Sequence, residues 1–468
     1  MKRLPGIFKK LFQRVVMVSV SILAQLVVFV LLIWRFQDHS QVIYVLLLLL
    51  SVAVTLIIIS KNTNPAYKIA WLVPILVFPV FGGLFYLMLG GNRLSSRQKR
   101  RMEQVNHTVH SHLHQDPETA RALGAENPDA FMESSYIQSV AGCPVYTGTE
   151  TRYFPLGDDA WPEMIAELLK AENYIFLEYF IIGEGIMWQS VLEVLKQKAA
   201  QGLDVRVMYD DFGCITVLPS GYRKQLEAWG IKCCVFGPYI PVVSARLNNR
   251  DHRKFMIIDG KTAFTGGINL ADEYINHKLR FGHWKDNAIL LRGPAVWSMT
   301  VMFLSLWNYV RGTSDDVEQF RPSLPAPGSG HGYVQPYADS PLDEERVADA
   351  VYMNLIARAK RYIHIMTPYL VIDYAMTQAL VNAAKAGVEV ILLTVLEVVT
   401  ERAVKNDDQA LVRLTGDLKL WVGLFCFWWN LLLCLQQKIG AVSVCVFAVL
   451  CGYSVFRCIR NKKVTENQ

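Results

Sequence analysis

The sequence predicts an α/β fold that is built from a duplicated unit and follows an apolar N-terminal region. From about residue 151, short apolar strands alternate with amphipathic helices, a pattern typical of α/β proteins. The pattern returns further along: AENYIFLEYF begins at Ala171 and AKRYIHIMTPYL at Ala359, and Gly202 is matched by Gly387, 185 positions later. These co-linear matches indicate an internal duplication of a strand–helix–strand unit.

The composition points to a membrane protein. The 468 residues are 52% hydrophobic and 19% charged, whereas soluble proteins are usually about 25% charged. This composition excludes a disordered chain and argues against an ordinary soluble one. The formal net charge of +6 permits contact with anionic lipid or nucleic acid but indicates neither.

Three uncharged runs, residues 15–33, 42–60 and 69–89, hold the N-terminal apolar excess. About 20 apolar residues suffice to cross a bilayer, so the runs predict a multi-pass anchor of transmembrane helices in the cell membrane. Basic clusters flank the anchor, and the positive-inside rule places them, with the catalytic part, in the cytoplasm. Three full spans cannot satisfy this rule. We therefore expect the third run, which Pro74 and Pro79 interrupt, to be re-entrant or interfacial.

Residues 93–150 are polar and lack strong periodicity, which favours a solvated connector with a basic start. The connector holds four closely spaced histidines, His107, His110, His112 and His114. Histidine-rich tracts bind metal in some proteins. No cysteine or acidic ligand is spaced to complete a site in the sequence, so we expect no metal.

The elements of the first unit follow in order. Apolar residues at helical spacing predict a helix over 158–172, and a near-continuous apolar run predicts a strand over 174–182. A helix over 187–201, which ends before a glycine, and a strand over 204–211 come next. The predicted organisation begins with an anchor (residues 1–92), a connector (93–150) and a first lobe with the catalytic motif (151–311). A linker (312–345), a partial second lobe (346–394) and a divergent apolar tail (395–468) follow.

The stretch HRKFMIID, residues 252–259, carries the candidate catalytic residues His252, Lys254 and Asp259. On a strand, His252 and Lys254 point to one face because side chains alternate. An imidazole can attack phosphorus to form a phosphohistidine, and a neighbouring ammonium stabilises the charge that develops on the phosphoryl oxygens. Asp259 lies at an odd offset from both, and either orients a histidine or serves the duplicated unit.

The stretch TGGINLADEY follows the motif and supplies Gly267 and Asn269 as candidate substrate-binding residues. The Asn269 amide is a potential donor to a phosphate oxygen. A basic surface strand with a stray histidine would explain His252 and Lys254 alone, but not the full pattern within a duplicated α/β unit. The chemistry requires no metal.

The chain resembles the phospholipase D superfamily, and more closely the bacterial cardiolipin synthases, from about residue 40 to about residue 394. The resemblance rests on several blocks of sequence, among them FLEYFII (176–182), YDDFG (209–213), NNRDHRKFMIIDG (248–260), TGGINLADEY (265–274), WKDNAILLRGPAV (284–296) and YIHIMTPYL (362–370). It implies a phospholipase D-like fold of two duplicated α/β/α lobes, of which the second is incomplete here.

The resemblance also implies a reaction in which two phosphatidylglycerol molecules give cardiolipin and glycerol. One histidine attacks a phosphatidyl phosphorus, a second histidine gives and takes the proton, and the headgroup hydroxyl of the second lipid completes the transfer. It implies no cofactor and no nucleic-acid partner. Glu178, Asp210 and Asp211 match family positions, and both a supporting role and a substrate-binding role are open for them.

The chain departs from the family pattern at the second catalytic motif. The duplication places a second histidine near residue 437, where the sequence reads QQKI, and the last histidine is His364. The tail, residues 395–468, is largely apolar and contains five of the nine cysteines. A shifted reading frame, a genuine variant with a membrane hairpin and an altered soluble core are competing explanations. We expect this chain to have little or no activity.

Two further hypotheses compete with the synthase. A phospholipase D-type phosphodiesterase would use water as the acceptor, which the apolar runs and the synthase-like blocks argue against. A catalytically inactive membrane protein that binds anionic lipid is favoured by the missing second histidine.

Overall fold

The structure, a computed structural model, describes residues 27, 41–61, 63–77, 82–90, 96–239, 249–280, 282–323, 330–339, 346–367 and 370–394. The predicted membrane run 15–33, except for Val27, and the tail 395–468 lie outside these residues, as do parts of the linker 312–345. The chain divides into two compact units, Met1–Asp349 and Ala350–Gln468.

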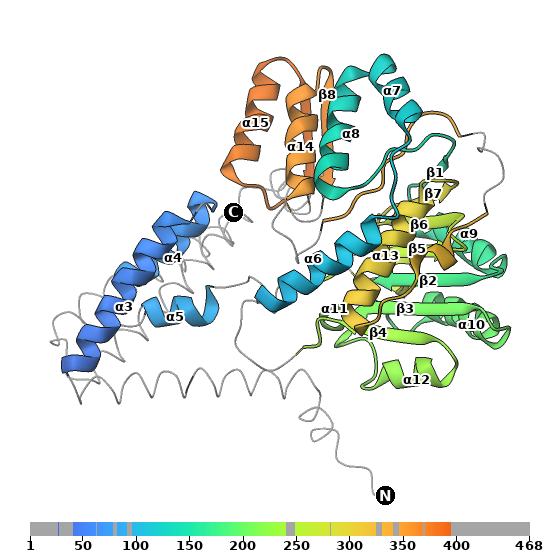
Figure 1. Ribbon diagram of the computed structural model, residues 1–468, viewed down its shortest axis with the longest axis horizontal. Helices are drawn as coiled ribbons and strands as arrows, with labels where there is room; N and C mark the ends of the chain where they lie inside the picture. Colours follow the sequence, from blue (N-terminus) through green and yellow to red (C-terminus); the bar gives the residue numbers. More distant parts are fainter. Residues whose placement is uncertain are drawn as a thin grey trace, which may run out of the picture. The chain divides into compact units, whose positions relative to one another are not determined.

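The first unit contains a seven-stranded mixed sheet with the strand order β1-β7-β6-β5-β2-β3-β4 (Figure 1). Strands β2, β3 and β4 run parallel to one another, and the remaining neighbours pair antiparallel. The strands are β1 (Glu150–Phe154), β2 (Tyr174–Tyr179), β3 (Asp204–Asp210), β4 (Lys232–Phe236), β5 (Phe255–Ile258), β6 (Thr262–Gly266) and β7 (Ala288–Arg292). Every residue of the central strand β2 is buried, which explains its continuous apolar sequence.

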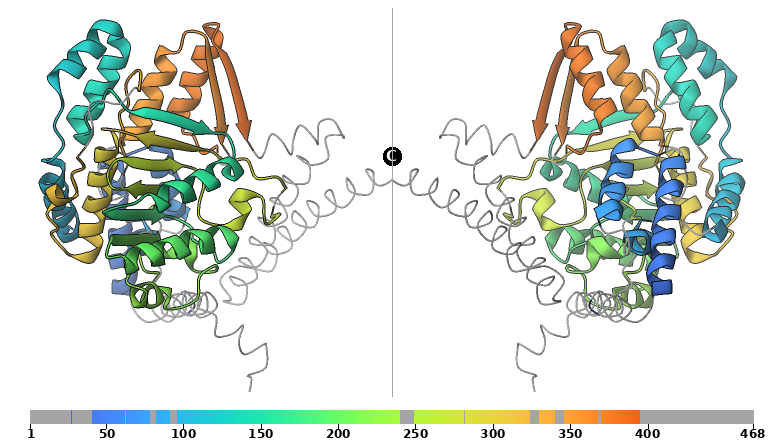
Figure 2. Two further views of the ribbon diagram at one scale, coloured as in Figure 1. Left: turned by 90° about the vertical axis from the view of Figure 1, so that its right-hand side faces the viewer. Right: turned by 90° about the vertical axis from the view of Figure 1, so that its left-hand side faces the viewer.

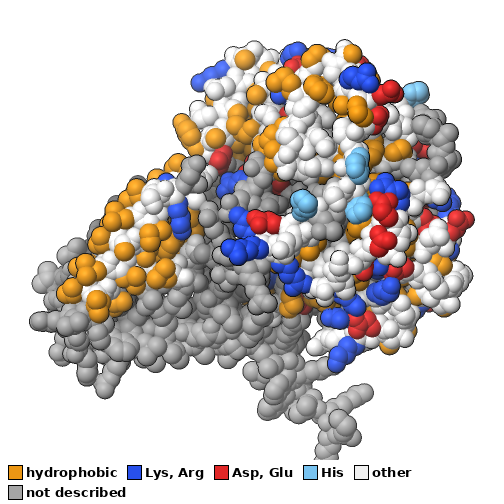
Figure 3. All heavy atoms as spheres, in the orientation of Figure 1, with side chains coloured by type: hydrophobic (Ala, Val, Ile, Leu, Met, Phe, Trp, Pro, Cys, Tyr) orange, Lys and Arg blue, Asp and Glu red, His pale blue; other side chains and the backbone are white. Residues whose placement is uncertain are grey.

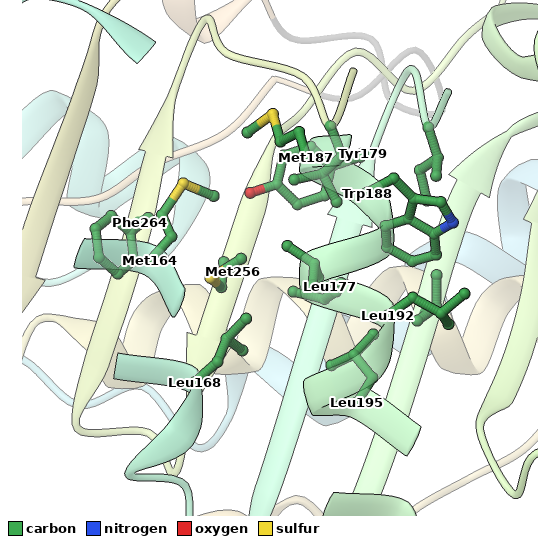
Figure 4. Packing of buried hydrophobic residues seen from close by; sticks show 14 of the residues in the cluster. Met164, Leu168, Leu177, Tyr179, Met187, Trp188, Leu192, Leu195, Met256 and Phe264 are labelled. Atoms are coloured by element: carbon green, nitrogen blue, oxygen red, sulfur yellow. The ribbon is translucent and has the colours of Figure 1, made fainter. Parts of the chain in front are cut away.

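Helices cover both faces of this sheet. Helices α9 (Gly157–Leu169) and α10 (Ile186–Ala200) pack on one face, and Figure 4 shows Met164, Leu168, Trp188 and Leu195 meeting Leu177, Met256 and Phe264 of the strands. Helix α13 (Val296–Arg311) lies against the other face, where Phe303 stacks on Phe176 with 4.6 Å between ring centroids. The shorter helices are α11 (Asp211–Cys214), α12 (Tyr222–Ala228), η2 (Asp272–Ile275) and η3 (Val317–Phe320).

The four predicted elements of the first unit are confirmed as α9, β2, α10 and β3, with small shifts at their ends. The predicted strand 174–182 is too long, because β2 ends at Tyr179. Beyond Tyr179 the chain no longer pairs with β5. The Ile181 N–H instead donates to the Asn269 side chain, and Ile182 forms a β-bridge with Leu270.

The predicted polar connector 93–150 contains three helices, although its sequence lacks strong periodicity. They are α6 (Ser96–His110), α7 (Pro117–Glu126) and α8 (Pro128–Ala141). Asp116 and Asn127 cap the last two with their side chains, each followed by a proline in the first turn. Helix α6 packs on α13, and the Ser305 hydroxyl donates to the Asn106 side chain at 2.5 Å.

The N-terminal part of the first unit forms three apolar helices, α3 (Gln41–Ser60), α4 (Pro65–Val77) and α5 (Gly82–Leu89). Pro74 lies inside α4 without ending it, and the third apolar run is divided between α4 and α5. Hydrophobic side chains gather on the surface of α3 and α4 (Figure 3). Within the described residues, no helix is both long and apolar enough to cross a membrane, which leaves the transmembrane helices a prediction.

The second unit repeats part of the first. Helix α14 (Val347–Arg358) leads into this unit, where β8 (Tyr362–Thr367), α15 (Tyr374–Lys385) and β9 (Glu389–Thr394) follow. The series has the order of α9, β2, α10 and β3. Strands β8 and β9 are parallel, as are β2 and β3, and they lie side by side in Figure 2. Gly202 and Gly387 adopt the same left-handed conformation, with φ of 92° and 93°. The second unit therefore contains a strand–helix–strand series like that of the first, as a duplication predicts.

Candidate active site

His252 and Lys254 lie in the extended segment that leads into β5, rather than on the strand itself. The His252 ring is exposed at the protein surface and lies against Phe180, with 4.7 Å between ring centroids. Lys254 is buried; its Nζ lies 5.6 Å from the centroid of the same Phe180 ring and donates to the His252 carbonyl oxygen at 2.5 Å. Phe180 thus brings together the two side chains that the motif predicts to act together.

The electrostatics of this pair suit a nucleophile beside a cation. Burial, and then the charge of Lys254, lower the pKa of His252 below its usual value, so the neutral imidazole prevails at neutral pH. Burial lowers the pKa of Lys254 to about 8, against the opposing effect of Asp251 and Asp286. At neutral pH Lys254 therefore carries a positive charge for most of the time.

Gly267 acts through its lack of a side chain. A Cβ at this position would lie 1.9 Å from Oδ1 of Asp286, and a Cβ at Gly266, whose φ is 151°, would lie 2.4 Å from the Asn287 carbonyl oxygen. The Gly267 N–H donates to that same carbonyl at 3.0 Å. The two glycines let Asp286 approach the site. The Gly267 N–H already has a backbone acceptor, the Asn287 carbonyl oxygen.

Asn269 is only 2% exposed and ties the loop after β6 to the end of β2. Its Oδ1 accepts from the Ile181 N–H at 2.9 Å, and its Nδ2 donates to the Tyr274 hydroxyl at 2.7 Å. One amide hydrogen stays outside these two bonds, so donation to a phosphate oxygen is compatible with this geometry.

Asp259 is not brought together with His252 and Lys254. It follows the far end of β5, roughly 20 Å of extended chain from His252. Its carboxylate accepts three backbone N–H bonds, from Glu172, Asn173 and Tyr174, each at 2.8 Å. These bonds fix the turn between α9 and β2. These contacts favour a structural role for Asp259 over the orientation of His252.

Glu178 does not meet substrate, because its side chain is fully buried. Its Oε1 lies 2.6 Å from Nε of Arg253, and the same Nε lies 3.2 Å from Oδ1 of Asp251. Burial, followed by repulsion from Asp251, raises the pKa of Glu178 well above its usual range against the attraction of Arg253. Glu178 therefore faces Arg253 inside the protein, and its substrate-binding role stays a prediction.

Asp210 and Asp211 support the loops beside the motif. Asp210 accepts N–H bonds from Asp251 at 3.0 Å and Phe212 at 2.8 Å, and burial raises its pKa to about 6. Asp211 accepts from the Tyr239 N–H at 2.5 Å. Of the two roles left open for these residues, the contacts favour support.

Sequence reasoning missed four residues around the motif: Phe180, Asp251, Arg253 and Asp286. Arg253 carried a signal, because a charged residue between His252 and Lys254 must point to the opposite face of an extended chain. Asp286 carried no such signal in the sequence. It lies in the connection between β6 and β7, and Gly266 and Gly267 allow it to approach Lys254. Among the described residues, no three potential metal ligands come together.

Comparison with known proteins places this site in a family. Residues 164–295, which include the site, match the family described as Cardiolipin synthase, PLD-like domain, and residues 47–91 match the family described as Phospholipase D-nuclease N-terminal. The cardiolipin synthase of Geobacillus kaustophilus is 33% identical over 343 residues, which cover 73% of this chain and 68% of the relative. The chain belongs to the cardiolipin synthase family.

Two further relatives show similar agreement. An uncharacterized protein of Streptococcus mutans is 42% identical over 338 residues, which cover 72% of both chains. The cardiolipin synthase of Geobacillus thermodenitrificans is 32% identical over 345 residues, which cover 73% of this chain and 68% of the relative. The resemblance that the sequence motifs indicate is therefore confirmed at the level of the family.

Proposed function

We propose that this chain is a phosphatidyltransferase that acts on phosphatidylglycerol, with His252 as the nucleophile. A nitrogen of the neutral imidazole forms a bond to the phosphatidyl phosphorus, and the bond from phosphorus to the glycerol oxygen breaks. The observation that carries this proposal is the arrangement of an exposed, uncharged His252 beside the buried ammonium of Lys254.

Lys254 is suited to stabilise the transition state. Its ammonium is held by the His252 carbonyl and the Phe180 ring, so it needs little rearrangement as negative charge develops on the phosphoryl oxygens. Asn269 is the second candidate donor to those oxygens. The membrane-proximal basic residues and the apolar helices suit a substrate drawn from an anionic bilayer, with the catalytic part on its cytoplasmic side.

The missing second histidine limits the proposed reaction. The glycerol alkoxide needs a proton to leave, and the acceptor hydroxyl must lose one before it attacks the phosphohistidine. No histidine follows His364 in the sequence to do either. We expect this chain to perform the first step slowly and to make little cardiolipin.

A chromogenic diester separates the first step from the rest. Bis(4-nitrophenyl) phosphate releases nitrophenolate, which leaves at neutral pH without a proton from the enzyme. Purified full-length protein should release about one equivalent of nitrophenolate in a burst and then turn over slowly. The burst should vanish in His252→Ala and persist in His277→Ala, which removes another exposed histidine of the same unit. A burst that survives in His252→Ala contradicts the assignment of the nucleophile.

The lipid products distinguish the competing functions. Labelled phosphatidylglycerol in mixed micelles should give traces of cardiolipin at most. Robust cardiolipin formation contradicts the proposed impairment, and phosphatidic acid as the main product would indicate a phosphodiesterase. The missing second histidine also favours an inactive lipid-binding protein. In that case the chain floats with phosphatidylglycerol vesicles but gives neither a burst nor a lipid product.

A further inference from the structure

A cluster of buried charges lies directly beneath the catalytic segment. It consists of Glu178 on β2 together with Asp251 and Arg253, which flank His252 in the chain; we call it the acid–arginine cluster. Glu178 is 0% and Asp251 4% exposed. The Arg253 Nε lies 2.6 Å from Glu178 Oε1 and 3.2 Å from Asp251 Oδ1. One guanidinium thus joins two carboxyl groups from different parts of the chain.

The cluster lies on the opposite side of the chain from the catalytic pair. Side chains alternate in an extended segment, so Arg253 and Phe255 share one face while His252 and Lys254 share the other. The guanidinium lies over the Phe255 ring, 5.7 Å from its centroid. Glu178 is the residue directly opposite Phe255 in the β2–β5 register, so its carboxylate meets Arg253 where the catalytic segment enters the sheet.

The segment is held on both sides of His252. On the N-terminal side, the Asp251 N–H donates to Asp210, whose carboxylate also accepts from the start of α11. On the C-terminal side, Arg253 is held by Glu178. These anchors come from β2, which pairs with β5, and from β3, the next strand beyond β2. The backbone of His252 therefore has little freedom relative to the sheet.

The cluster is a poor device for stability alone. Two carboxyl groups share one cation, and neither oxygen of Glu178 nor Oδ2 of Asp251 has a hydrogen-bond partner of good geometry among the described residues. Buried ion pairs can often be replaced by apolar side chains of similar size without loss of stability. Its position, by contrast, determines the direction in which the neighbouring His252 points.

We propose that the acid–arginine cluster is a positioning device that aims His252 at the phosphorus atom. This inference rests on the proposed function, because it takes His252 as the nucleophile. Glu178 and Arg253 touch no substrate; they act through the backbone of the segment and keep the imidazole beside Phe180 and Lys254.

The test replaces the pair by apolar side chains in the double variant Glu178→Leu/Arg253→Met of the full-length protein. The matched control is Glu167→Leu/Arg292→Met, a buried glutamate and a half-buried arginine 3.0 Å apart at the other end of the sheet. The first readout is the nitrophenolate burst from bis(4-nitrophenyl) phosphate. The second is the pH dependence of carbethoxylation of His252 by diethyl pyrocarbonate, followed by peptide mass spectrometry.

In the double variant, the burst should slow by about 100-fold, the loss expected from a misplacement of about 1 Å. The midpoint of His252 carbethoxylation should rise towards the ordinary value of about 6.5, because the ring leaves Phe180 and Lys254. The control should retain the wild-type burst and midpoint. A merely structural cluster would leave the midpoint of the folded protein unchanged, and that result would overturn the inference.

The outcomes separate this inference from the proposed function. If the wild type gives no burst that depends on His252, the proposed function fails, while the carbethoxylation midpoint still decides the positioning role. If the double variant does not fold, Arg253→Lys carries the test. It keeps the positive charge but cannot bridge both carboxyl groups, so it should slow the burst and raise the midpoint to a smaller extent. Wild-type values in Arg253→Lys would then overturn the inference.

Discussion

Asp259 belongs to the catalytic motif by sequence, yet its contacts predict a purely structural role. In Asp259→Ala, the N–H groups of Glu172, Asn173 and Tyr174 lose their acceptor. At about 1.5 kcal/mol for each bond to a charged group, the unfolding free energy should fall by about 4.5 kcal/mol. For a unit of this size, that corresponds to a decrease in unfolding temperature of about 10 °C.

Asp259→Asn is the matched control. Its Oδ1 can keep the two bonds from Asn173 and Tyr174, and asparagine tolerates the left-handed backbone, here with a φ of 53°. About 1.5 kcal/mol should be lost, from the one bond to Glu172. Thermal unfolding in detergent, followed by tryptophan fluorescence, measures both variants, and the nitrophenolate burst is measured well below their transitions. A variant that unfolds like wild type but has lost the burst would refute the structural assignment.

Three further predictions concern the surroundings of the motif. The nitrophenolate burst should slow as the pH rises through about 8, where Lys254 loses its proton, and Lys254→Arg should abolish this decline. Asp210 has its pKa raised by burial to about 6, so its stabilising contribution is complete below pH 4 and is lost as the pH rises through 6. Unfolding of wild type and Asp210→Asn at pH 4 and pH 7 should therefore show a relative shift of about 2 kcal/mol in favour of the variant, and no shift would disprove the raised pKa. Gly267→Ala should lower stability by about 2 kcal/mol, because its Cβ would lie 1.9 Å from Asp286. Gly124→Ala, within helix α7 and 3.4 Å from Phe131, serves as the control in thermal unfolding, and equal stability of the two variants would contradict the close approach.

The sequence predicted the strands and helices of the first unit because their patterns are local. The apolar run of β2 reflects its burial within the sheet, and the helical spacing of apolar residues in α9 reflects packing of this helix on the sheet. The sequence also predicted that Gly202 and Gly387 occupy matching positions, and both adopt the same left-handed conformation. Helices α7 and α8 escaped prediction because their apolar faces are weak. Their capping residues Asp116 and Asn127, each before a proline, were the available signal.

By itself, the sequence determined the family, the α/β class and the positions of His252 and Lys254, because spacing along one extended segment sets which side chains share a face. It also established that no histidine follows His364. Only the tertiary structure decided what Asp259 and Glu178 do. Their partners lie some 75 to 87 positions away along the chain, and β2 and β5 become neighbours only when the sheet forms. A carboxylate's role depends on the groups that surround it after folding, and no local pattern records those groups.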